Sequence, residues 1–153
     1  PTNQPPHKDT HLAAAGQRLR MVELAVGSNR CFGVLDWEIK RGSISYTIDT
    51  LKQLKRKYRQ KDFFLIIGAD LANAFNSWRD YRKIIRLVKI VVVKRKDFPV
   101  RQKGDFIFMD MPHVGITSSL VREYLKKGMT IRYLVPDSVE RYIKKHRLYL
   151  SSV

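Results

Sequence analysis

Residues 63 to 78, FFLIIGADLANAFNSW, decide the fold. The stretch opens with an unbroken apolar run, Phe63 to Ile67, that is rich in aromatic and β-branched types. A run this short predicts a buried parallel strand rather than a buried helix. Gly68 ends the run, and Asp70 lies where a following helix should begin. Because open α/β sheets bind ligands beyond the carboxyl ends of their strands, we expect a ligand site at this junction.

Strand and helix patterns alternate on both sides of this stretch. The expected strands cover residues 31–35, 63–67, 90–93 and 106–109, with Trp37 and Ile39 continuing the alternation of the first. Helices are expected to begin at a cap formed by Asp9 or Thr10, at 45–47, after Gly68, at Asp80, at 115–119, and at Pro136 or Asp137. This alternation predicts parallel β-α units with right-handed crossovers. No internal repeat or linker interrupts the chain, so we expect a single α/β domain over residues 1–153.

The chain is strongly basic. Its 153 residues include 30 Lys and Arg against 14 Asp and Glu, a net charge of +16. A charge of this size attracts polyanions, which could be nucleic acid, an anionic membrane surface or phosphorylated small molecules. The run of cations from Lys52 to Lys61 is expected to be a solvated helix face, because aromatic residues do not interleave it. Nucleic acid is therefore not the expected partner.

Cys31 is the only cysteine, which excludes an internal disulfide and favours a reducing compartment. Since it lies in the expected strand 31–35, we predict a buried and inert thiol. No run approaches the roughly 18 apolar residues that a membrane span requires, and no signal peptide is visible. These features predict a soluble, cytoplasmic protein without a membrane partner.

Three expected junctions share one design, in which a strand ends and a polar turn leads into a helix. They are Ser45-Tyr46-Thr47 with Asp49, Gly68-Ala69-Asp70, and Thr117-Ser118-Ser119 with Arg122. Free N–H groups at a helix start, three hydroxyls and an Arg one turn later can hold phosphate oxygens, so the third junction is the clearest anion site. The alternative is a helix cap followed by a solvated Arg.

Other candidates remain open when judged alone. Asp70 could accept hydrogen bonds from ribose hydroxyls or cap the next helix, and Trp78 could stack on a flat ligand or fill the core. His7 and His11 lie four residues apart without a third ligand nearby, so we expect no metal site. Neither a GxxxxGK[ST] phosphate loop nor a GxGxxG turn is present.

Taken in order, these motifs closely resemble the nicotinate-nucleotide adenylyltransferase family of the nucleotidyltransferase superfamily. The matching residues are Pro5-Pro6-His7-Lys8, Arg18-Leu-Arg-Met21, Leu24-Ala25, Ser45 to Leu51, Ile67 to Asp70, Trp78, Ile116 to Ser119 with Arg122, Leu134-Val135-Pro136, Val139, Tyr142-Ile143 and Leu148-Tyr149. The resemblance implies a Rossmann-like, three-layer fold with a mainly parallel sheet. It also implies that the phosphate of nicotinate mononucleotide attacks the α-phosphorus of ATP, with Mg²⁺ on the ATP phosphates. The products would be deamido-NAD and pyrophosphate, formed without a protein nucleophile.

The resemblance also assigns roles to residues. Thr47 and Trp78 would hold the nicotinate ring, and the local backbone would read its carboxylate. Gly68 and Asp70 would bind the ribose of ATP. Thr117, Ser118, Ser119 and Arg122 would hold the ATP phosphates, and Lys8 with His7 would border the phosphate of the mononucleotide.

One departure from the family is large. The N-terminal strand and its GxFxPxHxGH motif, whose histidines contact the reacting phosphates, do not occur here, so no catalytic residue is assigned. The first helix and second strand of the family are absent as well. In a sheet of order 3-2-1-4-5 the missing strands would be central, and their loss would expose apolar faces and unpaired backbone. We therefore expect that the sequence is incomplete or that the missing segment is supplied separately, and that this chain alone catalyses poorly.

Two further functions stay open on the sequence alone. A related enzyme could use another phosphate acceptor, such as nicotinamide mononucleotide or phosphopantetheine, although Tyr46, Thr47 and Trp78 favour a pyridine ring. Alternatively, a catalytically silent remnant could bind polyanions such as RNA, as the net charge of +16 would allow. A homo-oligomer is also left open.

Overall fold

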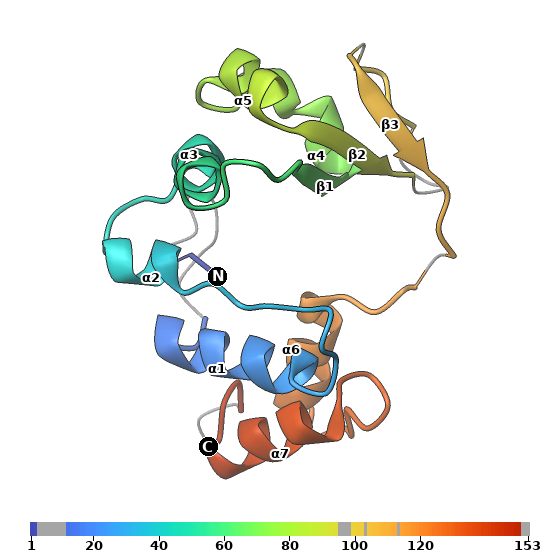
Figure 1. Ribbon diagram of the computed structural model, residues 1–153. Coiled ribbons are helices and arrows are strands. Elements are labelled where there is room, and N and C mark those ends of the chain that lie inside the picture. The colour runs from blue at the N-terminus through green and yellow to red at the C-terminus, as the bar shows by residue number, and fades with distance from the viewer. Residues whose placement is uncertain (3–11, 95–98, 103, 113, 151–153) are drawn as a thin grey trace. The chain divides into compact units, whose positions relative to one another are not determined.

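A computed structural model describes residues 1–2, 12–94, 99–102, 104–112 and 114–150 (Figure 1). The chain forms two compact units, one of Tyr46–Val114 and one of Pro1–Ser45 with Gly115–Val153. His7, Lys8 and His11, and the predicted caps Asp9 and Thr10, lie outside the described residues.

The unit Tyr46–Val114 is built on a parallel sheet (Figure 1). Its strands β1 (Phe64–Gly68), β2 (Lys89–Val93) and β3 (Phe106–Met109) pair in the order β1-β2-β3. The helices are α3 (Thr47–Lys57), α4 (Ala69–Asn73) and α5 (Tyr81–Leu87), with a 3-10 turn, η1 (Phe75–Ser77), between the last two. The α/β fold with a parallel sheet is therefore confirmed, as are three of the four predicted strands.

The core of this unit explains why its helices form. Ile48 and Leu51 of α3 are spaced three residues apart and are both buried, which is the pattern of an amphipathic helix. They pack with Phe75, Ile84 of α5 and Val92 of β2 in one cluster. Each fully buried side chain of this size contributes roughly 1.5–3 kcal/mol to folding. This cluster fixes α3, α4 and α5 against the sheet.

Strand β1 is only half-buried, which corrects the prediction of a fully buried strand. Ile67 lies in the core, but Phe64 and Ile66 are 54% and 65% exposed. Successive side chains of a strand point to opposite faces of the sheet, so β1 buries one face and leaves the other in solvent.

The second unit is helical in its described part. It consists of α1 (Ala15–Val26), α2 (Trp37–Arg41), α6 (Ser118–Lys126) and α7 (Asp137–Lys145). Val121, Leu125, Ile131, Val139, Ile143 and Leu148 form its buried cluster. Helices α1 and α7 pack together, and the Ser138 hydroxyl donates a hydrogen bond to the Leu24 carbonyl at 3.0 Å. Helix α1 begins at Ala15, several residues later than the predicted caps.

The predicted strand 31–35 is wrong. Residues 31–35 form a turn and irregular backbone, and Trp37–Arg41 form α2. The Asn29 side chain accepts a hydrogen bond from the Cys31 N–H at 2.9 Å, which turns the chain, and Asp36 pairs with Lys40 at 2.7 Å along α2. The predicted burial of the Cys31 thiol is wrong as well, because this residue is exposed. The junction at 45–47 consequently follows a helix and not a strand.

Candidate functional site

The carboxyl end of β1 brings Gly68 and Asp70 into direct proximity. Gly68 precedes α4, and Asp70 lies in the first turn of that helix. A Cβ atom on residue 68 would lie 2.5 Å from the Asp70 Oδ1 atom, so the carboxylate occupies the space that only a glycine leaves free. Asp70 is exposed, and no side-chain hydrogen bond caps α4. Of the two roles left open by the sequence, the structure removes capping and leaves an available carboxylate.

A cavity of about 240 Å³ opens at this edge of the sheet. It is lined by Ile66, Ile67 and Gly68 at the end of β1, Val93 and Lys94 at the end of β2, and Met111, Pro112 and Val114 after β3. Most of the lining is apolar, and among the described residues that form it Lys94 carries a positive charge. Its position matches the rule for parallel sheets that located the candidate junction. Lys94 lines this cavity, and no motif of the sequence points to it.

Trp78 and Thr47 lie on two segments of the same unit that meet. Thr47 is the first residue of α3 and Tyr46 precedes it, while Trp78 directly follows η1. The guanidinium carbon of Arg79 lies 4.5 Å from the centre of the Tyr46 ring. Trp78 is half-buried, and its ring centre lies 5.3 Å from that of the core residue Phe75. Trp78 therefore packs against the core while part of it stays accessible.

Charge next to these residues is mainly positive. Lys83 binds the Asp80 carboxylate at 2.9 Å, and this hydrogen bond is the main reason why the pKa of Asp80 lies below its ordinary value. Partial desolvation opposes the shift, and the charges of Lys83, Lys52 and Arg79 add to it. The carboxylate nearest to the Trp78 segment is thus already paired.

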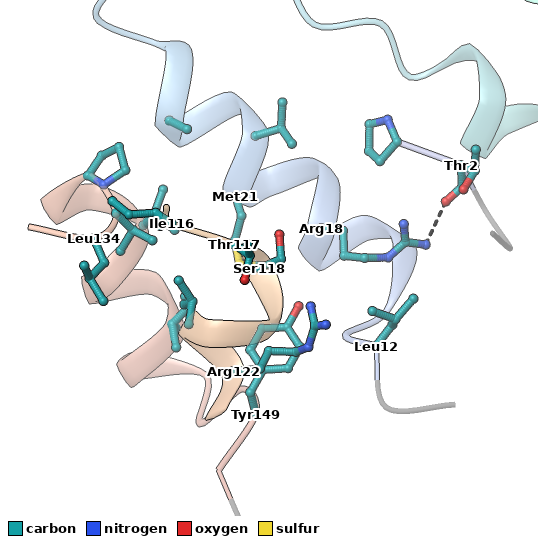
Figure 2. A pocket seen from close by; sticks show the side chains of 18 residues that line it. Thr2, Leu12, Arg18, Met21, Ile116, Thr117, Ser118, Arg122, Leu134 and Tyr149 are labelled. Carbon is teal, nitrogen blue, oxygen red and sulfur yellow. Dashed lines mark hydrogen bonds between the residues drawn. The ribbon is translucent and has the colours of Figure 1, made fainter. Parts of the chain in front are cut away.

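The start of α6 lies in the other unit and faces a cavity of about 620 Å³ (Figure 2). Thr117, Ser118 and Arg122 line this cavity. The Thr117 hydroxyl accepts a hydrogen bond from the Leu120 N–H at 3.1 Å and thereby caps the helix. Arg122 Nη2 donates to the Ser119 hydroxyl at 3.2 Å. The capping role foreseen as an alternative is therefore present, and Arg122 is held by its own helix.

Arg18 of α1 lines the same cavity as Arg122 (Figure 2). Its guanidinium donates to the Thr2 carbonyl at 2.7 Å and to the Ala13 carbonyl at 3.1 Å. Met21 and Val22 of α1 add apolar lining. Arg18 is one of the residues that match the family, but the sequence alone gives it no role, because its place in the wall of this cavity depends on tertiary packing.

The predicted site residues thus fall into two sets. Thr47, Gly68, Asp70 and Trp78 belong to the unit Tyr46–Val114, and Thr117, Ser118, Ser119 and Arg122 belong to the other. Within the described ranges, no three His, Cys, Asp or Glu side chains gather into a group that could hold a metal ion. None of the helices in the described part of the chain is long and apolar enough to cross a membrane.

Comparisons with known proteins agree with these motifs. The family described as cytidylyltransferase-like matches residues 1–124. The probable nicotinate-nucleotide adenylyltransferase of Dictyoglomus thermophilum is 38% identical over 159 residues, which cover 98% of this chain and 82% of the relative. The protein of the same name from Oceanobacillus iheyensis is 35% identical over 149 residues, which cover 97% of this chain and 78% of the relative.

Solved structures extend the likeness to the fold. Plasmodium falciparum nicotinic acid mononucleotide adenylyltransferase complexed with APC superposes with a TM-score of 0.72 at 20% identity, over 92% of this chain and 78% of that one. The same enzyme complexed with NaAD gives a TM-score of 0.70 at 19% identity. At these identities the likeness concerns the fold alone.

The fold and the family match over residues 1–124 define a nucleotidyltransferase of the cytidylyltransferase-like class. Within that class, the chain belongs to the nicotinate-nucleotide adenylyltransferase family, since relatives of that name share more than a third of its residues over almost its whole length. The family predicted from the ordered motifs is therefore confirmed.

Proposed function

We propose that this chain transfers the adenylyl group of ATP to nicotinate mononucleotide, which yields deamido-NAD and pyrophosphate in NAD biosynthesis. The observation that supports this most strongly is its membership of the adenylyltransferase family, with 38% identity to one relative over 98% of the chain. The family match covers parts of both units, so we treat residues 1–153 as one nucleotidyltransferase domain. The reducing compartment favoured by a lone cysteine is consistent with a cytoplasmic enzyme.

The proposed reaction requires alignment and charge neutralisation more than covalent chemistry. A phosphate oxygen of the mononucleotide bonds to the α-phosphorus of ATP while the bond to the leaving pyrophosphate breaks. Both substrates are anions, so the protein must hold them in line and offset their repulsion. A divalent metal, which we propose to be Mg²⁺, would arrive with ATP as part of the substrate and reduce the charge of its phosphates. This role agrees with a protein that supplies hydroxyls and cations.

The proposed roles of the residues are given for each unit separately. In the unit Tyr46–Val114, the available carboxylate of Asp70 beside Gly68 would accept hydrogen bonds from ribose hydroxyls of ATP. Thr47 would contact the nicotinate ring at the start of α3, and the accessible part of Trp78 would stack on it.

In the other unit, the Thr117 hydroxyl can still donate its proton while its oxygen caps α6. Together with Ser118, Ser119 and Arg122 it would bind phosphate oxygens at a helix start that favours anions. His7 and Lys8 would border the phosphate of the mononucleotide.

Binding tests this proposal more sharply than turnover, because the affinity for each of the two substrates can be measured separately. ATP and nicotinate mononucleotide should each raise the melting temperature of the wild-type chain, since ligands that bind the folded state stabilise it. Asp70→Asn should weaken ATP binding about tenfold, the size expected for a hydrogen bond to a charged acceptor. It should leave the affinity for the mononucleotide unchanged.

The matched control for Asp70→Asn is Asp105→Asn, an exposed Asp of the same unit that lines neither cavity. This control should bind ATP like the wild type. A wild-type chain that neither substrate stabilises would contradict the proposed function. An Asp70→Asn variant with unchanged ATP affinity would contradict the role of this carboxylate.

A further inference from the structure

Arg79 lies at the point where the two proposed ring-binding segments meet. It directly follows Trp78 in the sequence, and its guanidinium lies over the ring of Tyr46, the residue before Thr47. The distance of 4.5 Å from the guanidinium carbon to the ring centre is within the range of a cation–π contact. Although the Arg79 side chain is exposed, this contact orients it toward the start of α3.

No carboxylate of the described residues forms a salt bridge with Arg79. Its sequence neighbour Asp80 binds Lys83 at 2.9 Å, and Lys52 and Arg79 only add to the field at that carboxyl group. The N-terminus of α3 contributes a partial positive charge, which Asp49 in the first turn partly offsets. The Arg79 guanidinium therefore places a positive charge beside Tyr46 that no salt bridge among the described residues neutralises.

We propose that Arg79 is a specificity-determining residue, which makes the chain prefer a pyridine mononucleotide carrying a ring carboxylate over one carrying a neutral carboxamide. This inference rests on the proposed function, in which Thr47 and Trp78 hold the ring. A carboxylate on a ring between these residues lies close to the guanidinium and is attracted by it. A carboxamide of the same shape gains no such attraction, so the charge of Arg79 separates two otherwise similar substrates.

The contact with Tyr46 gives this residue a role in the proposal that can be tested separately. An exposed Arg samples many rotamers, and stacking on an aromatic ring restricts them. Loss of the Tyr46 ring should therefore keep the charge of Arg79 but allow its guanidinium to occupy more positions. Tyr46 is thus a positioning residue for Arg79, and the two should act as a unit and not independently.

The experiment measures dissociation constants of nicotinate mononucleotide and nicotinamide mononucleotide by calorimetry, on the full chain at low ionic strength. Arg79→Gln should reduce the ratio of the two affinities about fivefold, the size expected for one charge interaction near the surface. The loss should come from the acid, while the affinity for the amide changes less than twofold. Arg79→Lys should retain more of the ratio than Arg79→Gln, and added salt should reduce the wild-type ratio.

Arg82→Gln is the matched control. Arg82 is also exposed, lies near a Tyr ring with its guanidinium 5.8 Å from the centre of Tyr81, and is three residues from Arg79. Its substitution removes the same charge from the same unit and should change the ratio less than twofold. Tyr46→Leu should lower the ratio in the same direction as Arg79→Gln but less, and the double variant should match Arg79→Gln alone.

The outcomes separate this inference from the function on which it rests. A wild-type chain that binds neither mononucleotide overturns the proposed function and the inference together. A wild type that prefers the acid, combined with an Arg79→Gln variant of unchanged ratio, overturns only the inference. An equal loss in Arg82→Gln also overturns it, because the preference would then reflect net charge and not the position of Arg79.

Discussion

The starts of α4 and α6 share one pattern, a turn of small residues that leads into a helix, but they differ in structure. Both place a polar side chain beside free backbone N–H groups. At α6 the Thr117 hydroxyl is used by its own helix, where it accepts a hydrogen bond from Leu120. At α4 no side chain caps the helix, and the Asp70 carboxylate lies over Gly68. A polar residue at a helix start can therefore serve the fold or remain available for a ligand, and only its hydrogen bonds distinguish the two.

Gly68→Ala tests whether the Asp70 carboxylate at the start of α4 binds ATP, and we expect it to have the largest effect. The new Cβ would lie 2.5 Å from Asp70 Oδ1, so the carboxylate must move. We expect a loss of ATP affinity of tenfold or more, measured by calorimetry. Because Asp70 Oδ1 is the end of an exposed side chain that can turn away, the free energy of unfolding, measured in urea, should change by less than about 1 kcal/mol.

Gly16→Ala is the control for that experiment, because nothing lies within 4 Å of the position that its Cβ would occupy in α1. It should leave ATP affinity unchanged and stabilise the chain by about 0.5–1 kcal/mol, since Ala is the better helix former. Unchanged ATP binding in Gly68→Ala would show that Asp70 is not held in its binding position by the glycine.

Thr117→Ala tests the capping role of the hydroxyl at the start of α6. Because its hydroxyl caps α6, its removal should cost about 1 kcal/mol of stability. Asp70→Asn, by contrast, should change stability by less than about 0.5 kcal/mol, as is usual for exposed residues without such a role. Urea unfolding of both variants measures the difference. Thr117→Ser keeps the hydroxyl and should remain within about 0.5 kcal/mol of the wild type; equal losses in the Ala and Ser variants would exclude capping as the cause.

Two of the predicted strands show how much of the fold could be predicted from the sequence. The apolar run before Gly68 predicts β1 because a short run of these residues is stable mainly in a sheet, and the structure agrees to within one residue. The alternation after Cys31 failed, because alternation produces a strand only where a neighbouring strand pairs with it. In its place, the Asn29 side chain turns the chain and α2 follows.

Candidate site residues that lie close together in the sequence could be predicted to be neighbours, whereas contacts that depend on tertiary packing could not. Thr117 and Arg122 belong to one helix, so their spacing alone places them together. Arg79 and Tyr46 are 33 residues apart, and only the packing of the unit brings them into contact. The same is true of Arg18, whose place beside Arg122 depends on how α1 packs in its unit.

Ser119→Ala should have the smallest effect and decides whether the start of α6 binds anions beyond capping itself. The Ser119 hydroxyl accepts a hydrogen bond from Arg122 at 3.2 Å and so limits where that guanidinium can go. Its removal should weaken ATP binding about two- to threefold, because a solvent-exposed hydrogen bond to the Arg122 guanidinium contributes little beyond its orientation. Stability should stay within about 0.5 kcal/mol of the wild type, since Ser119 is exposed and does not cap the helix. Ser119→Thr retains the hydroxyl and should bind ATP like the wild type. If Ser119→Ala and Arg122→Gln both bind ATP like the wild type, the polar residues at the start of α6 serve the helix and do not bind ATP. The two helix starts would then differ in function as well as in structure.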